Sequence, residues 1–123
     1  MNMNAVALAV LGVVGALHTR VYRNKTPSTP SYPFVLVTAD SAVPSDPSSD
    51  LYISVDVVDD PNATVTAMEV LADTIQNALD DKIISNSAVN LHLTIEQRQY
   101  VSNTDLVTQQ MVNLRFVCRA YFK

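Results

Sequence analysis

The clearest pattern in the chain is an alternation of apolar and other residues near its C-terminal end. Every second residue from Val112 to Phe122 is apolar, and Asn113, Arg115, Arg119 and Tyr121 lie between them. Side chains of a β-strand point alternately to the two faces of a sheet, so this segment is predicted to be a strand with one buried face. A slip of one residue would expose the whole apolar set, which fixes the register.

Three more strands are predicted upstream. The segment Leu51–Val57 alternates in the same way, and Phe34–Val37 is continuously apolar, as expected of a strand that lies centrally or against a partner. In the third segment Leu91, Leu93 and Ile95 face one way, whereas His92, Thr94, Glu96 and Arg98 face the other. Three of the four predicted strands therefore have one apolar and one polar face.

Two segments are predicted to be helices. Val65, Met68, Ala72, Ile75 and Leu79 recur at the spacing of one helical face, which predicts a helix through about residue 81.

The run from Ala5 to Leu17 has no charged or strongly polar side chain. A helix of that length reaches roughly 20 Å, too short for the roughly 30 Å core of a bilayer. As a helix it would be apolar nearly all round, so a neighbouring subunit is expected to cover part of it. The alternative is a secretory signal with Val14-Gly15-Ala16 as its cleavage site, although Met1–Asn4 carries no basic side chain.

These elements predict an α+β domain over residues 1–123. We expect a four-stranded, mainly antiparallel sheet with two helices packed on one face, one N-terminal and one between the second and third strands. The segment Asp40–Asp50, rich in Ser, Asp and Pro, is expected to be an exposed loop. The open face of the sheet is expected to carry Tyr52, Asp56, His92, Glu96, Arg98, Arg115, Arg119 and Tyr121.

Composition removes several classes of protein. With 123 residues, 48% of them hydrophobic, the chain is one globular domain, and its single cysteine excludes an intrachain disulfide. One cysteine and two histidines also exclude a Cys/His zinc cage. The net charge of -4 makes the chain a poor binder of phosphate backbones.

No residue pattern indicates catalysis, a metal site or a cofactor site. Cys118 lies between the apolar positions 116 and 120, which is typical of an inert core thiol. His92 and Glu96 are about 13 Å apart along a strand, too far to chelate one ion. The acidic residues between 40 and 60 lack EF-hand spacing, and two glycines, Gly12 and Gly15, cannot build a phosphate loop or a nucleophile elbow.

The order of segments nevertheless resembles a known family. Arg20-Val21-Tyr22, a Pro-containing connection and Tyr32-Pro33-Phe34-Val35-Leu36-Val37 precede the strand at Leu51–Val58 and the helix that ends at Leu79. This phrase is similar to one in the tail terminator, or tail completion, proteins of long-tailed bacteriophages.

The resemblance implies a structural virion protein. Family members form a ring, typically a hexamer, at the head-proximal end of the tail; the ring caps the tail tube, stops its polymerisation and offers a docking surface to the head–tail connector protein. Assembly would take place in the host cytoplasm, and DNA would pass through without specific binding, since six copies carry about -24. The tube- or connector-contact loops are expected to be Asp40–Asp50, with Asp40, Asp46 and Asp50, and Gln99–Gln110, with Asn103 and Asp105.

Contacts between subunits are expected at the mixed charges of the open sheet face, with Arg115, Arg119, Glu96 and Arg98 as candidates. Two other functions stay open at this point. One is a head-completion or connector-adaptor protein of the same machine, and the other is a secreted ligand-binding module.

Overall fold

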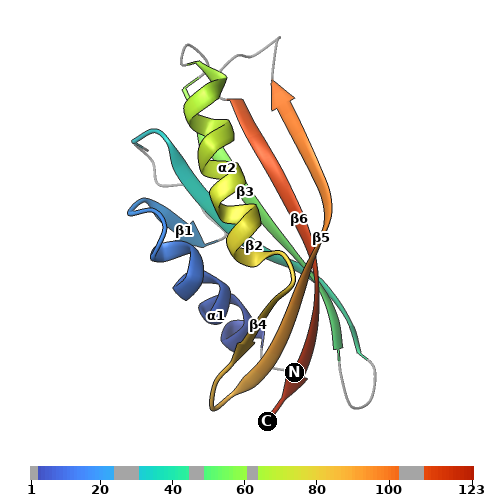
Figure 1. The fold of residues 1–123 in the computed structure, drawn as a ribbon. Coiled ribbons are helices and arrows are strands. Elements are labelled where there is room, and N and C mark those ends of the chain that lie inside the picture. Colours follow the sequence, from blue (N-terminus) through green and yellow to red (C-terminus); the bar gives the residue numbers. More distant parts are fainter. Residues whose placement is uncertain (1–2, 24–30, 45–48, 61–63, 103–109) are drawn as a thin grey trace.

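The computed structural model describes residues 3–23, 31–44, 49–60, 64–102 and 110–123. Two helices and six strands follow one another along these residues (Figure 1). In chain order they are α1 (Met3–Gly15), β1 (Val21–Arg23), β2 (Phe34–Pro44), β3 (Ser49–Asp59), α2 (Val65–Leu79), β4 (Lys82–Ser85), β5 (Val89–Ser102) and β6 (Gln110–Phe122).

The six strands form one mixed sheet in the order β1-β2-β3-β6-β5-β4. β1 pairs with β2 in parallel, and the other neighbours are antiparallel. The prediction of a four-stranded, mainly antiparallel sheet is therefore wrong. The sheet is a strongly curled, half-barrel layer whose two outermost strands, β1 and β4, were not predicted.

Both missed strands are too short to show a period of two. β1 has three residues and β4 has four, and β4 places Ile83 and Ile84 side by side. Pairing with a longer neighbour creates them: Val21 lies opposite Val35, and Ile84 lies opposite Leu91. Short strands at both edges limit the unpaired backbone that the sheet offers to other chains.

The core lies between the sheet and the two helices, which pack against the same side of it (Figure 1). α2 buries Met68, Ala72, Ile75 and Leu79, four of the five residues of the expected stripe. The fifth, Val65 at the start of the helix, is exposed, so its predicted burial is wrong. The sheet contributes the apolar alternation of β3, β5 and β6, and in β3 and β6 it buries Leu51, Ile53, Val55, Val57, Val112, Leu114, Phe116, Cys118 and Ala120.

α1 is covered on one side only. Val6, Val10 and Val14 are fully buried in the core. Leu8 is 55% exposed, and a Cβ added at Gly12 would meet no atom within 4 Å. This protomer therefore leaves part of the apolar helix uncovered.

The two strands that border the expected loop Asp40–Asp50 are longer than predicted. β2 runs to Pro44, because an extra residue between Ala39 and Ser41 forms a β-bulge that the ladder with β3 accommodates. β3 begins at Ser49. Residues 40–44 and 49–50 of the expected loop therefore belong to strands, so the predicted loop is wrong there, and residues 45–48 lie outside the described residues.

Phe116→Ala tests whether the core that stabilises the fold lies only on the helix side of the sheet. Phe116 is fully buried, so the truncation is expected to lower the free energy of unfolding by about 3–5 kcal/mol. The neighbouring Val117→Ala, on the opposite face of the same strand, is the control and should cost about 1 kcal/mol or less. Chemical denaturation of both variants measures the difference, and equal losses would contradict the assignment of the two faces.

Candidate functional site

A second β-bulge changes which residues of β5 face the helices. Ile95 lies opposite Phe116, but Gln97 lies opposite Arg115, so Glu96 is the extra residue. An extra residue shifts the alternation by one position. From this point on, Arg98 lies opposite the buried Leu114 and points to the helix side.

Arg98 is bound to α2 by three side chains. Its guanidinium donates to Asp73 at 2.6 Å, to Gln76 at 2.9 Å and to Glu69 at 2.9 Å. Burial alone lowers the pKa of Arg98, but the hydrogen bonds and charges of Asp73 and Glu69 outweigh it and raise that pKa. Arg98 therefore connects α2 to the sheet. The prediction that Arg98 lies on the open face of the sheet is wrong.

The open face keeps its other predicted members on β3 and β6, and Arg115 lies at its centre. The Arg115 guanidinium carbon lies 4.2 Å from the centroid of the Tyr52 ring, in cation–π geometry. Its Nε is buried and has no hydrogen-bond partner in the described part of the chain. A buried donor without an acceptor is costly, so this atom is a place where an acceptor from another molecule would be favourable.

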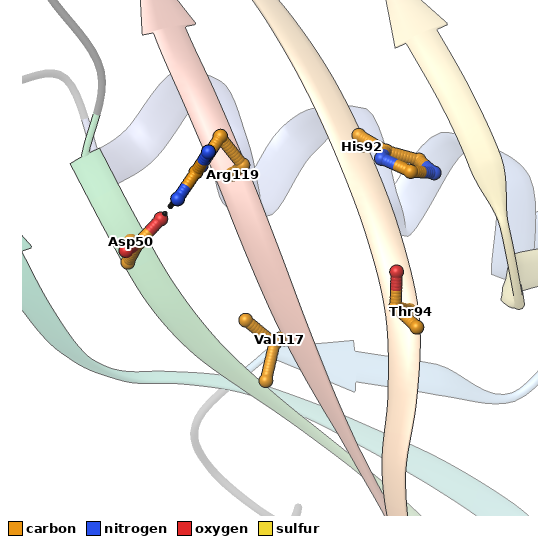
Figure 2. Close-up of a pocket in the computed structure, with 5 residues that line it drawn as sticks. All are labelled: Asp50, His92, Thr94, Val117 and Arg119. Carbon is orange, nitrogen blue, oxygen red and sulfur yellow. Dashed lines mark hydrogen bonds and ion pairs between the residues drawn. The ribbon is translucent and has the colours of Figure 1, made fainter.

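Next to this centre the face is hollowed by a shallow pocket of about 250 Å³. Figure 2 shows that Arg119 points toward Asp50, with Nε to Oδ1 at 3.1 Å, whereas His92 is turned away from Arg119. His92 Nε2 instead lies 2.6 Å from Oδ1 of Asp81. Both of these side-chain contacts are solvent-exposed, and exposed polar or charged pairs contribute little to stability, so the pocket is a solvated polar surface.

The predicted contact loops are only partly described. Asp50 lies on β3, beside Arg119 of β6. Asp40 belongs to the bulged part of β2, and its side chain is outside the description. Asp46, Asn103 and Asp105 lie outside the described residues.

Among the described residues, no three His, Cys, Asp or Glu side chains lie close enough to hold a metal ion. Over the same part of the chain, neither helix is long and apolar enough to cross a membrane. What the geometry offers is a broad face of paired charges around Arg115 and Tyr52, which suits contact with another protein surface.

Cys118 provides a test for an enzymatic role. Burial, with a smaller effect of the Asp50 charge, raises the pKa of its thiol to about 12. The thiol therefore stays protonated at pH 8, and a thiol reagent is expected to label the native protein roughly 1,000-fold more slowly than the unfolded chain. Absorbance after reagent addition, with and without denaturant, measures both rates; fast labelling of the native protein would contradict the inert assignment.

No protein-family model matches the chain, and no curated protein sequence matches it either. Among the solved structures that match, two are similar over nearly the whole length. One is a chain of the "Virion of native gene transfer agent (GTA) particle", with a TM-score of 0.74, 19% sequence identity, and coverage of 97% of this chain and 96% of that chain. The other has a TM-score of 0.72 and 13% identity and covers 100% of this chain and 98% of that chain. At these identities the likeness establishes a common fold from end to end.

Proposed function

We propose that this chain is a structural virion protein that forms a ring on the tail tube, stops tube polymerisation and provides the docking surface for the head connector. The observation that carries the proposal is the full-length fold likeness to a chain of a gene transfer agent virion. The sequence phrase from Arg20 to Val37 supports the tail-terminator role within that class.

The physical mechanism is complementary capping. One face of the ring reproduces the contacts that a tube subunit offers, and so binds the last tube ring. The opposite face lacks those contacts, so no further tube subunit is added. The net charge of -4 per copy lets DNA pass without being held by phosphate contacts.

The incomplete burial of α1 is consistent with a neighbouring subunit that covers its exposed side. Leu8 at 55% exposure and the open space beside Gly12 leave an apolar stripe that a monomer exposes to water. Arg115, Arg119 and Glu96 remain the proposed subunit-contact residues, whereas Arg98 is committed to α2 within its own chain.

A tube-length assay tests the capping role. The tail tube protein encoded with this chain is allowed to polymerise with increasing amounts of the purified protein, and tube lengths are measured by electron microscopy. Tubes are expected to become shorter until each end is occupied. Unlimited growth at saturating concentration would overturn the capping role, and binding to connector rings without an effect on length would favour the adaptor alternative.

Arg115→Glu tests the open face as a subunit contact. Buried Arg side chains beside aromatic rings are common hot spots, so self-association should weaken roughly 30-fold, equivalent to about 2 kcal/mol. Arg119→Glu should weaken it less, because Asp50 already balances the Arg119 charge. Mass photometry measures association, and thermal unfolding monitors the fold; loss of the fold with unchanged association would contradict the assignment.

A further inference from the structure

Charge is distributed very unevenly along the chain. Residues 1–39 contain three basic and no acidic residues, so all twelve acidic residues occur from Asp40 onward. The net charge of -4 hides this division, because the first segment carries +3 and the remainder carries -7.

The fold converts this division into two oppositely charged edges of the sheet. β1 forms one edge of the sheet and β4 the other. On the β1 edge, Arg23 donates to the amide oxygen of Asn4, and Arg20 donates to the backbone carbonyls of Pro33 and Tyr32 at 3.0 and 3.4 Å. All these acceptors are uncharged, so the described part of this edge keeps its positive charge.

The β4 edge is acidic and partly apolar. Asp80 and Asp81 directly precede β4, and the Asp81 side chain is 86% exposed. Glu96 is exposed on β5 beyond the stretch that pairs with β4, which covers positions 90–93. Ile83, on β4 itself, is 69% exposed. Lys82 offsets one of the three carboxylates, and Lys123, which donates to the carbonyl of Asn86 directly after β4, offsets a second. Asp81 is also hydrogen-bonded to His92, so the edge keeps a small net negative charge.

We infer that the basic β1 edge of one copy contacts the acidic β4 edge of the next copy, head to tail. This inference rests on the proposed function, to whose open-face contact it adds a second contact between neighbouring copies, from edge to edge around the ring. Two different patches on one chain produce a heterologous contact, and such contacts close into rings when the rotation permits. Complementary charge also disfavours symmetric pairing of two copies, because two β1 edges repel each other, as do two β4 edges. A second copy of this chain is the partner that carries both patches in matched form.

Charge exchange between the two edges tests the contact. Arg23→Glu and Glu96→Lys are each expected to weaken self-association about tenfold at low salt, where the Debye length of about 30 Å lets whole patches interact. The double variant R23E/E96K restores opposite charges in exchanged positions and should recover most of the loss. Mass photometry over a range of protein concentrations measures association, and circular dichroism verifies the fold of each variant.

Lys123→Glu is the matched control, because it makes the same charge change as Arg23→Glu beside the β4 edge, where Lys123 donates to the backbone carbonyl of Asn86. Negative charge added there complements the basic β1 edge, so association should not weaken. The inference is overturned if either edge variant associates like the wild type, or if the double variant is no better than the single ones.

The tube-length assay run on the same variants separates this inference from the proposed function. Wild-type-like association of the edge variants together with normal capping would overturn the edge contact alone. The expected charge-exchange result together with uncapped tubes would overturn the capping role alone.

Discussion

A sheet with one apolar face has to bury that face, and in this chain two helices do so. α2 supplies a complete buried stripe from Met68 to Leu79, and α1 adds Val6, Val10 and Val14. Everything on the other face is consequently left to solvent or to other molecules. The division into a buried and an open face, set by the alternation in β3 and β6, therefore decides both the fold and the surface available for assembly.

The β-bulge at Glu96 modifies that division at one place. It turns Arg98 from the open face to the helix side, where Glu69, Asp73 and Gln76 on one stripe of α2 receive it. The helix side of the sheet thus carries a partly buried guanidinium that donates to three acceptors on α2. Arg115, one strand away, stays on the open face, and its Nε lacks an acceptor within the described residues. Two arginines in adjacent strands thereby have different roles, one within the chain and one at the surface.

The strand order also places basic residues at one edge of the sheet and acidic residues at the other. The acid-free N-terminal segment enters the sheet as its first strand, and the acidic turn after α2 leads into its last. A sheet whose two edges attract each other favours head-to-tail association over symmetric pairing.

Much of this architecture could be anticipated from local pattern. Alternation identified β3, β5 and β6, a continuous apolar run identified the first part of β2, and the 3.6-residue period identified α2, because these patterns record which sides of an element are buried. The short strands β1 and β4 have no readable period, and the run from Glu96 to Gln99 contains no apolar residue that would reveal a change of face. Those features follow from pairing with distant segments. The sequence by itself determined which residues avoid water and where charge is placed along the chain; only the tertiary structure decided the strand order, the bulges and hence which charges share a face or an edge, because these depend on contacts between residues far apart in the chain.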